Sequence, residues 1–401
     1  MMFVLGVVLF ALGLLASISW HECGHMWAAQ RTGMKVRRYF VGFGPTLWST
    51  RKGETEYGLK AVPLGGFCDI AGMTTHDVIA PEDESRAMFR QKPWKRIVVL
   101  VAGPSMNLIL GFVLIVIMAI GWGLPSLNET LPAKVGSLSC VGTTINNNEL
   151  ASCSGEGPAQ QAGLQIGDTV VAANGEKISS TSELSTVLRA GTAPVTLTVE
   201  RSGSEREVIV TPQKVTVTGT DEQGAPVTKE IGMVGIGYDT GWQNPSVLGA
   251  VPAAAGFTGD LMVRTWESLI SLPSKISDLW TSVTGGERAA DTPVSVVGAS
   301  VIGGDAADHG VWWFFIFLLA SINFFLALFN LVPLLPLDGG HMAIVGYEKV
   351  RNTLRGSRGL AAGPPVDYMK LMPITYVVLA IMGGYMALTL TADIVNPIKA
   401  F

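Results

Sequence analysis

The chain has 401 residues, of which 48% are hydrophobic and only 15% charged, and its mean hydropathy is +0.38. This composition is more apolar than that of an ordinary soluble enzyme and indicates a protein of the lipid bilayer. The formal net charge of −4 is spread along the chain. It provides no concentrated basic surface, which excludes a nucleic-acid-binding role.

Four stretches of the chain contain no Asp, Glu, Lys or Arg over a length that can cross the hydrocarbon core of a bilayer. They are residues 1–21, 97–128, 310–337 and 371–392. The first has no basic n-region and no small-residue cleavage site, and it runs directly into a charged motif. We therefore expect it to stay in the protein rather than act as a removable signal. The sequence predicts four transmembrane helices.

The distribution of basic residues predicts how these helices are oriented. Twelve Lys and Arg residues fall in the short segment 31–96 and five in 339–370, against ten in the much longer segment 122–310. Loops rich in basic residues stay in the cytoplasm, so we expect both dense segments there. Four crossings then place the two termini and the long central segment outside.

The run His21-Glu22-Cys23-Gly24-His25 at the end of the first stretch is an H-E-x-x-H motif. Its two histidines lie one helical turn apart on one face, so both imidazoles can reach one Zn²⁺. Glu22 is placed to accept a proton from a metal-bound water. An accidental match is the alternative, but two of only five histidines fall on this spacing. The motif predicts metal-assisted hydrolysis.

A zinc protease needs a third protein ligand and an open fourth position, and Asp338 is the candidate. It closes the third stretch in the run N-L-V-P-L-L-P-L-D-G-G from Asn330 to Gly340. This stretch crosses the membrane in the same direction as the first, so both motifs are expected near the cytoplasmic face. Pro333 and Pro336 break the helix, which is tolerated at membrane depth only where the backbone packs against protein or lines a cavity.

Segment 31–96 holds two short strand patterns, at 41–45 and 58–67, with turn residues at their ends. We expect a hairpin or small sheet whose exposed edge could hold a substrate by strand addition. An ordinary cytoplasmic loop is the alternative.

The second stretch contains a G-P-x-x-N pattern from Gly103 to Asn107. Its small residues allow close helix contact, and its amide can form a hydrogen bond across helices. We expect Asn107 to serve helix packing, with an approach to the metal site as the alternative.

The central segment contains a small domain. Residues 162–175 have the pattern of a helix end, a turn, a strand and an N-G turn, and alternating strands complete a unit that spans about 131–217. The pattern resembles the core of a PDZ domain, and another small β-rich domain is the alternative. Cys140 and Cys153 fall in this external segment, where a disulfide and two free thiols are both possible.

The H-E-x-x-H motif combined with the distant N-x-x-P-x-x-x-x-D-G pattern resembles the site-2 protease family of intramembrane metalloproteases, in its bacterial form with an extracytoplasmic PDZ domain. The resemblance implies His21, His25 and Asp338 as zinc ligands, Glu22 as catalytic base, and Asn330 as a substrate-positioning or oxyanion-side residue. It also implies regulated intramembrane proteolysis in a bacterial plasma membrane. Single-span proteins such as anti-sigma factors would be cleaved after another protease has trimmed them.

The predicted fold is a polytopic α-helical membrane protein with four transmembrane helices, a membrane-associated β element and an extracytoplasmic PDZ-like α+β domain. The expected order is a first span with the zinc motif (1–30), a cytoplasmic or membrane-reentrant β region (31–96), a second span (97–124), the PDZ-like domain (125–217), an external strand with membrane-surface helices (218–309), a third span with the D-G motif (310–340), a cytoplasmic loop (341–370), a fourth span (371–392) and an external tail (393–401).

Two other functions fit parts of this pattern. A PDZ-bearing membrane adaptor or chaperone could carry a structural metal, but a structural site does not need Glu22. A metal transporter is disfavoured because the ionisable groups cluster at one end of the bundle and discontinuous repeat halves are absent. The favoured function is a zinc-dependent endopeptidase. Its expected partners are a membrane-protein substrate, a peptide or protein ligand of the PDZ-like domain, and the lipid bilayer.

Overall fold

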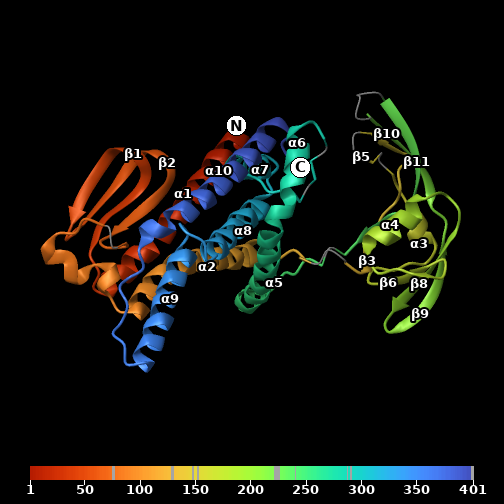
Figure 1. Cartoon of the computed structure of the whole chain (residues 1–401). Helices are drawn as coiled ribbons and strands as arrows, with labels where there is room; N and C mark the ends of the chain where they lie inside the picture. Colours follow the sequence, from red (N-terminus) through yellow and green to blue (C-terminus); the bar gives the residue numbers. More distant parts are fainter. Residues whose placement is uncertain are drawn as a thin grey trace. The chain divides into compact units, whose positions relative to one another are not determined.

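The computed structural model shown in Figure 1 describes residues 1–74, 77–127, 131–146, 149–150, 153–220, 226–239, 241–286, 288–289 and 291–398. The chain forms two compact units. Residues 1–122 and 245–401 make a mainly helical unit, and residues 123–244 make a β-rich unit.

Within the described part of the chain, four helices are long and apolar enough to span a membrane. They are α1 (Met2–Arg31), α2 (Pro93–Gly121), α8 (Trp312–Asn330) and α10 (Met372–Val395), the last preceded by a 3-10 turn from Tyr368. Bulky apolar side chains such as Val4, Ile109 and Ile381 remain exposed along them, as expected of surfaces that face lipid. The predicted number of spanning helices is confirmed by length and composition.

The third span is shorter than the predicted 310–340. α8 ends at Asn330, and after a turn the chain begins α9 (Asp338–Ser357). The helix stops because Pro333 and Pro336 have no N–H with which to continue it. The segment 341–370, predicted as a loop, is therefore helical as far as Ser357.

The turn before α9 packs tightly on the first residues of that helix. A Cβ atom on Gly339 would lie 2.3 Å from the carbonyl oxygens of both Leu331 and Val332, and one on Gly340 would lie 2.6 Å from the carbonyl carbon of Leu334. Side chains other than hydrogen do not fit at these two positions. The glycine pair after Asp338 thus allows the chain to fold back, and this fixes where α9 begins.

Three further helices lie in the region expected at 218–309: α5 (Ala250–Ser271), α6 (Ile276–Val283) and α7 (Val296–Asp308). α7 packs along α1, and a Cβ atom on Gly6 would lie only 2.5 Å from the Ala307 Cβ. Helix backbones approach this closely only where small residues face one another. α7 is therefore an integral part of the bundle.

Two buried ion pairs join elements of the helical unit. Arg96 of α2 donates to Glu348 of α9 at 2.6 Å, and both side chains are less than a tenth exposed. Arg288 pairs with Asp393 of α10 at 2.7 Å, and Asp393 also accepts from the backbone N–H of Ser295 just before α7. Breaking either pair would leave a buried charge uncompensated, so these contacts fix α9 on α2 and α10 on α7.

β1 (Val36–Lys52) and β2 (Thr55–Ile70) form a sheet that folds back on itself, as Figure 1 shows. The end of β1 pairs with the start of β2 as a hairpin. The beginning of β1 pairs on one side with the end of β2 and on the other with residues 56–59. The fold-back occurs at Gly42 and Gly44, whose φ angles of 88° and 80° favour glycine. The two predicted short strands lie within these longer ones.

The described residues of the β-rich unit form two sheets and two short helices. Its elements are β3 (Ala133–Leu138), β4 (Thr144–Asn146), β5 (Glu149–Leu150), α3 (Pro158–Gln161), β6 (Thr169–Ala173), β7 (Glu176–Lys177), α4 (Thr181–Arg189), β8 (Val195–Arg201), β9 (Ser204–Val210), β10 (Gln213–Thr220), β11 (Pro226–Met233) and β12 (Ile236–Tyr238). The larger sheet has the order β12-β3-β6-β8-β9, with β7 paired to β6, and the smaller sheet has the order β11-β10-β4-β5.

The core and the boundary of this unit follow from its pairing. Leu184 of α4 and Leu197 of β8 are fully buried against the larger sheet. β12 pairs with β3, so the unit runs to Asn244 and does not end at residue 217.

Cys140 and Cys153 form a disulfide, with their Cα atoms 5.8 Å apart. Of the two possibilities that the sequence left open, a disulfide or two free thiols, the structure has the disulfide.

An ion pair joins two neighbouring interior strands of the larger sheet, at the end of β8 and the start of β6. Arg201 at the end of β8 donates through two nitrogens to the two carboxylate oxygens of Asp168, at 2.7 and 2.6 Å. The backbone N–H of Gln165 donates to the same carboxylate at 2.8 Å. Burial by itself would raise the pKa of Asp168, but the guanidinium and the backbone donor outweigh it, so the pKa lies below its usual value.

We expect acid to weaken the β-rich unit through Asp168. Because the folded pKa is depressed, the carboxylate contributes stability that is fully present above the unfolded pKa of about 3.9 and is lost as the pH falls through the folded pKa. Hydrogen exchange of β6 and β8 in the full chain, corrected for intrinsic rates, should show easier opening below about pH 4. Asp168→Asn should open more easily at neutral pH and depend less on pH. An identical pH dependence in both proteins would contradict this role.

Candidate metal centre

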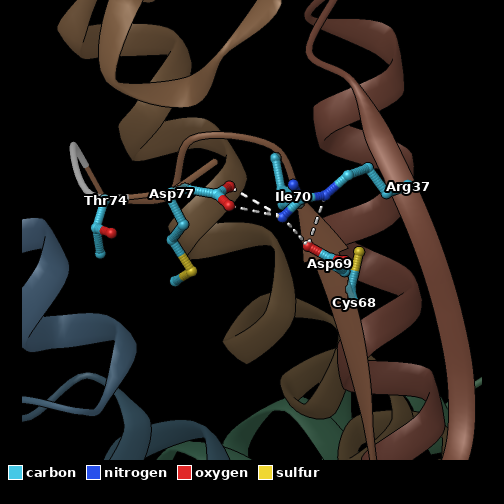
Figure 2. A pocket seen from close by; sticks show the side chains of 7 residues that line it. Arg37, Cys68, Asp69, Ile70, Thr74 and Asp77 are labelled. Carbon is cyan, nitrogen blue, oxygen red and sulfur yellow. Dashed lines mark hydrogen bonds and ion pairs between the residues drawn. The ribbon is translucent and has the colours of Figure 1, made fainter. Parts of the chain in front are cut away.

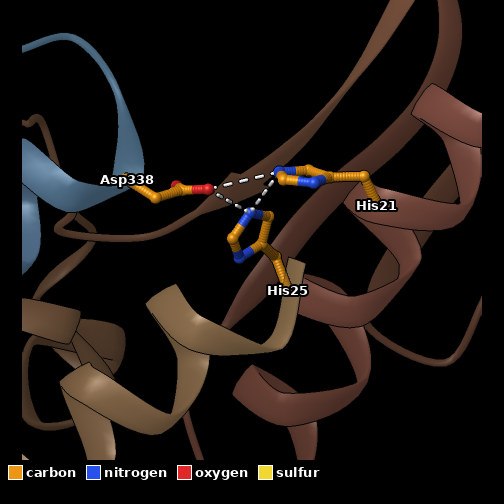
Figure 3. A group of neighbouring side chains, drawn as sticks. All are labelled: His21, His25 and Asp338. Atoms are coloured by element: carbon orange, nitrogen blue, oxygen red, sulfur yellow. Dashed lines mark hydrogen bonds and ion pairs between the residues drawn. The ribbon is translucent and has the colours of Figure 1, made fainter. Parts of the chain in front are cut away.

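Three potential metal ligands from two distant segments converge in the helical unit, as Figure 3 shows. His21 and His25 project from one face of α1, and Asp338 is the first residue of α9. Their facing atoms form a triangle. The two Nε2 atoms are 3.1 Å apart, and Asp338 Oδ2 lies 3.2 Å from His21 Nε2 and 3.3 Å from His25 Nε2.

This triangle fits a tetrahedral zinc ion. With ligand distances of about 2.0 to 2.1 Å, neighbouring ligand atoms of such an ion are about 3.3 Å apart. Both imidazoles are buried, and Asp338 Oδ2 is buried without a hydrogen-bond partner of good geometry. A buried acceptor left in this state calls for an explanation, and a shared cation supplies one. Three protein ligands leave the fourth position open, which is the arrangement of catalytic zinc sites.

The ring of His25 is fixed by a second contact. Its Nδ1 lies 2.8 Å from the backbone oxygen of Val99 on α2, and because a carbonyl can only accept, Nδ1 must carry the hydrogen. The lone pair of the neutral ring is then on Nε2, which faces His21 and Asp338. A backbone carbonyl that holds the far nitrogen of a metal-binding histidine is the usual way in which such a ring is oriented.

Two glycines allow α1 and α2 to cross at this site. A Cβ atom on Gly24 would lie 2.5 Å from the Ala102 carbonyl oxygen. One on Gly103 would lie 2.3 Å from His25 Nε2 and 2.7 Å from His21 Nε2. Gly103 therefore forms a wall of the metal site and has no room for a side chain. The G-P-x-x-N pattern, predicted to serve helix packing, in fact lines the candidate centre through Gly103.

Glu22 is held by the sheet beside α1. The backbone N–H of Cys68 in β2 donates to Glu22 Oε2 at 2.9 Å. Tyr39 of β1 donates its hydroxyl to the Ser19 carbonyl on α1 at 2.7 Å, which keeps the sheet against this helix. Glu22 is also close enough to His21, His25 and Asp338 to interact with them electrostatically. One carboxylate oxygen is thus anchored next to the three ligands.

A pocket of about 310 Å³ opens on the other side of Cys68, shown in Figure 2. Arg37 of β1 reaches across it and donates to Asp69 at 2.6 Å and to Asp77 at 2.9 Å. Asp77 in turn accepts from the backbone N–H of Gly72 at 2.7 Å. These contacts of Arg37 and Asp77 pin the loop after β2 onto β1, next to the N–H that holds Glu22.

Asn330, implied as a substrate-positioning residue, lies at the last position of α8. Its Nδ2 donates to the Leu326 carbonyl one turn earlier, at 3.0 Å. In the part of the chain that the structure describes, no hydrogen bond joins it to the three converging side chains. The structure thus brings His21, His25, Asp338 and Glu22 together. Asn330 lies at the end of α8, before the turn that leads to Asp338.

The sequence favours helix packing for Asn107, with an approach to the metal site as the alternative, and the structure supports the alternative: the Asn107 Nδ2 lies 3.4 Å from His21 Nδ1. The signal for both Gly103 and Asn107 was the G-P-x-x-N pattern. The pattern alone could not tell which helix, and which face of it, these two residues meet.

The fold and the site together define a membrane metallopeptidase: the spanning helix α1 carries two histidines and an anchored glutamate, and the carboxylate of Asp338 at the start of α9 meets the histidines. Comparisons with known proteins agree. A model of Peptidase family M50 matches residues 9–374. The chain is 50% identical, over the whole length of both proteins, to the zinc metalloproteases Rip1 of Mycobacterium tuberculosis H37Rv and Mycolicibacterium smegmatis. It is 28% identical to a putative zinc metalloprotease of Clostridium perfringens, over 98% of this chain and 99% of that protein.

The chain therefore belongs to peptidase family M50. The resemblance to the site-2 protease family, which the two motifs indicated, is confirmed. The zinc metalloprotease names of the relatives agree with the coordination that the three donor atoms offer.

We expect Gly103→Ala to destroy the centre. The added methyl group would displace both imidazoles, and a misplacement of about 1 Å at a reacting centre costs roughly 100-fold in rate. Zinc content of the purified full chain and its proteolytic rate should both fall. Gly121→Ala on the same helix is the matched control, because a Cβ there meets nothing within 4 Å. Zinc content equal to wild type in Gly103→Ala would contradict this description of the site.

Proposed function

We propose that this family M50 metalloprotease is a zinc-dependent intramembrane endopeptidase that hydrolyses peptide bonds within or next to a transmembrane segment of its substrate. The observation that carries the proposal is the triangle of His21, His25 and Asp338 with edges of 3.1 to 3.3 Å, built on apolar helices next to Glu22. A substrate at this site has to leave its helical form locally, because a helical backbone hides its carbonyls from attack.

His21, His25 and Asp338 would hold the zinc ion, which when bound supplies Lewis acidity and lowers the pKa of water. Glu22 is placed to act as general base and to pass the proton on to the leaving nitrogen. The Cys68 N–H fixes Glu22 Oε2, and the other carboxylate oxygen then takes the proton. Asn330, at the start of the turn that leads to Asp338, is proposed to orient the substrate backbone.

The topology is proposed from two independent features. Basic residues are densest in 31–96 and 339–370, which favours a cytoplasmic position for these segments and for the nearby zinc site. The β-rich unit carries the Cys140–Cys153 disulfide, whereas Cys23 and Cys68 of the helical unit are free thiols. Disulfides persist in oxidising compartments, so the β-rich unit and both termini are proposed to lie outside a bacterial plasma membrane.

The β-rich unit is proposed to act as a PDZ-like module. β12 is the terminal strand of the larger sheet, and Ser185 of α4 donates to the Tyr238 hydroxyl of β12 at 3.2 Å. A terminal strand beside a helix is the arrangement that binds peptides by strand addition. The module would then select membrane-protein substrates that another protease has trimmed, such as anti-sigma factors, either by binding their new ends or by excluding bulky ectodomains.

The alternative of a membrane adaptor or chaperone with a structural metal is less well supported. A structural zinc site closes all four positions with protein ligands, whereas the described residues place three donors together. A glutamate held beside an open coordination position can act as general base in hydrolysis. A structural zinc site does not require such a residue.

The test compares the wild-type chain with Glu22→Gln after reconstitution with a panel of single-span membrane proteins. Glutamine keeps the size of the side chain and an oxygen acceptor for the Cys68 N–H, so zinc content should stay near one per chain. Cleavage should fall by about 100- to 10,000-fold, the usual contribution of a general base. Equal cleavage by both proteins would refute the role of Glu22. Failure of zinc-loaded wild type to cleave any substrate in the panel would favour the adaptor.

A further inference from the structure

The two histidines of the candidate centre are supported differently on the side that faces α2. Each ring points Nε2 toward the common triangle and Nδ1 toward α2. Nδ1 of His25 meets a backbone carbonyl at 2.8 Å, a group that can only accept. Nδ1 of His21 meets the side-chain amide of Asn107, with its Nδ2 at 3.4 Å. An amide can either donate or accept a hydrogen bond. The contact with Asn107 therefore does not fix whether Nδ1 of His21 carries a hydrogen, whereas the carbonyl does fix this for His25.

The amide of Asn107 is only half satisfied in this orientation. The side chain is 1% exposed, and its Oδ1 is buried without a hydrogen-bond partner. A donor at Nδ1 suits only the ring form that carries its hydrogen on Nε2, and that hydrogen would point toward Asp338 Oδ2, 3.2 Å away. The lone pair of this ring form is on Nδ1, which faces α2, so Nε2 could not bind a metal ion in the triangle.

A half-turn of the amide removes both difficulties without changing the space that the side chain occupies. Oδ1 then faces Nδ1 and accepts its hydrogen, which satisfies the buried oxygen. The hydrogen on Nδ1 leaves the lone pair of the neutral ring on Nε2, pointing at the ligand triangle. His21 then has the same support as His25, with an oxygen acceptor from α2 behind each ring.

We propose that Asn107 is a positioning residue for His21: in the metal-loaded protein its Oδ1 accepts the Nδ1–H of the imidazole and so fixes the ring form and direction that bind zinc. The inference rests on the proposed zinc site and adds a residue to it. Because the amide can turn, it serves His21 with and without the metal ion. A neutral amide also avoids adding a third carboxylate to Glu22 and Asp338 among apolar helices, where each charge is costly.

The position of Asn107 on α2 follows from the crossing of α1 and α2. Asn107 lies four residues after Gly103, on the same face of the helix. Gly103 lies close to both Nε2 atoms. The next turn of α2 therefore lies beside the Nδ1 side of the His21 ring, where Asn107 meets it.

Asn323 on α8 is a matched comparison within the same bundle. It is also an asparagine, it is 0% exposed, and its Oδ1 is likewise buried without a partner. Its Nδ2 donates to the hydroxyl of Ser17 at 3.0 Å and to the Leu319 carbonyl at 2.8 Å. It therefore shares the chemistry and burial of Asn107 but has no imidazole as partner.

The experiment measures zinc affinity of the purified full chain by competition with a chelator, together with the absorption spectrum of the cobalt-substituted protein. Asn107→Leu keeps the shape of the side chain and removes its acceptor, so zinc affinity should fall by about 10- to 100-fold and the cobalt bands should shift. Asn107→Asp keeps the acceptor and should stay within about threefold of wild type, as should Asn323→Leu. Circular dichroism and thermal unfolding of the metal-free variants separate misfolding from loss of affinity.

Three results would overturn the inference. They are wild-type affinity in Asn107→Leu, a loss in Asn107→Asp as large as in Asn107→Leu, and an equal loss in Asn323→Leu. The first means that no acceptor is needed, the second that an oxygen acceptor at this position does not support His21, and the third that the effect belongs to any buried amide of the bundle. Wild-type protein that binds no zinc would refute the proposed function itself, and this inference with it.

Discussion

The close crossing of α1 and α2 is the constraint on which the rest of the site depends. Gly24 lies against the backbone of α2, and Gly103 lies against the imidazoles of α1, so each helix contributes a glycine to the contact. Because the two helices cross this closely, α2 can supply the Val99 carbonyl that holds His25 and the Asn107 amide that faces His21. A wider crossing would leave both rings without these contacts and free to adopt other rotamers.

Energetics explain why the ligands have to be held this firmly. A charged side chain at membrane depth costs about 3 kcal/mol on insertion scales, so Glu22 and Asp338 together cost about as much as the net stability of a small domain. Structural zinc sites return about 10 to 16 kcal/mol on binding. A metal ion can therefore offset the cost, but only if Asp338 reaches the two histidines. The proline-containing turn, the Gly339–Gly340 pair and the Arg96–Glu348 ion pair together place the first residue of α9 where it does so.

The sequence was sufficient to predict the spanning helices and the convergence of His21, His25 and Asp338, because these depend on local composition and on motif chemistry. A stretch without charges has to be buried in lipid, and histidines four residues apart share a helix face whatever surrounds them. Contacts between helices could not be predicted from the sequence in this way. Ala299, Gly303 and Ala307 of α7 recur every four residues, but this spacing does not say that the partner is α1. Asn107 could likewise be assigned to the candidate metal centre only once the crossing was known. The prediction of a cytoplasmic loop at 341–370 follows from the position of this segment between two spans. It does not take account of the helix-forming residues that extend α9 to Ser357.

The folded-back sheet of β1 and β2 belongs to the active site and is not merely an appendage of the helices. The Glu22 carboxylate accepts a hydrogen bond that α1 cannot supply, because the backbone N–H groups of α1 are engaged within the helix. The terminal strand of the sheet has backbone N–H groups on its outer side, and the one of Cys68 meets the carboxylate. This contact requires the fold-back at Gly42 and Gly44 and the clamp of Arg37 on Asp69 and Asp77. The position of Glu22 is thus set by a segment that contributes none of the three converging side chains, and any movement of this sheet would move Glu22 with respect to them.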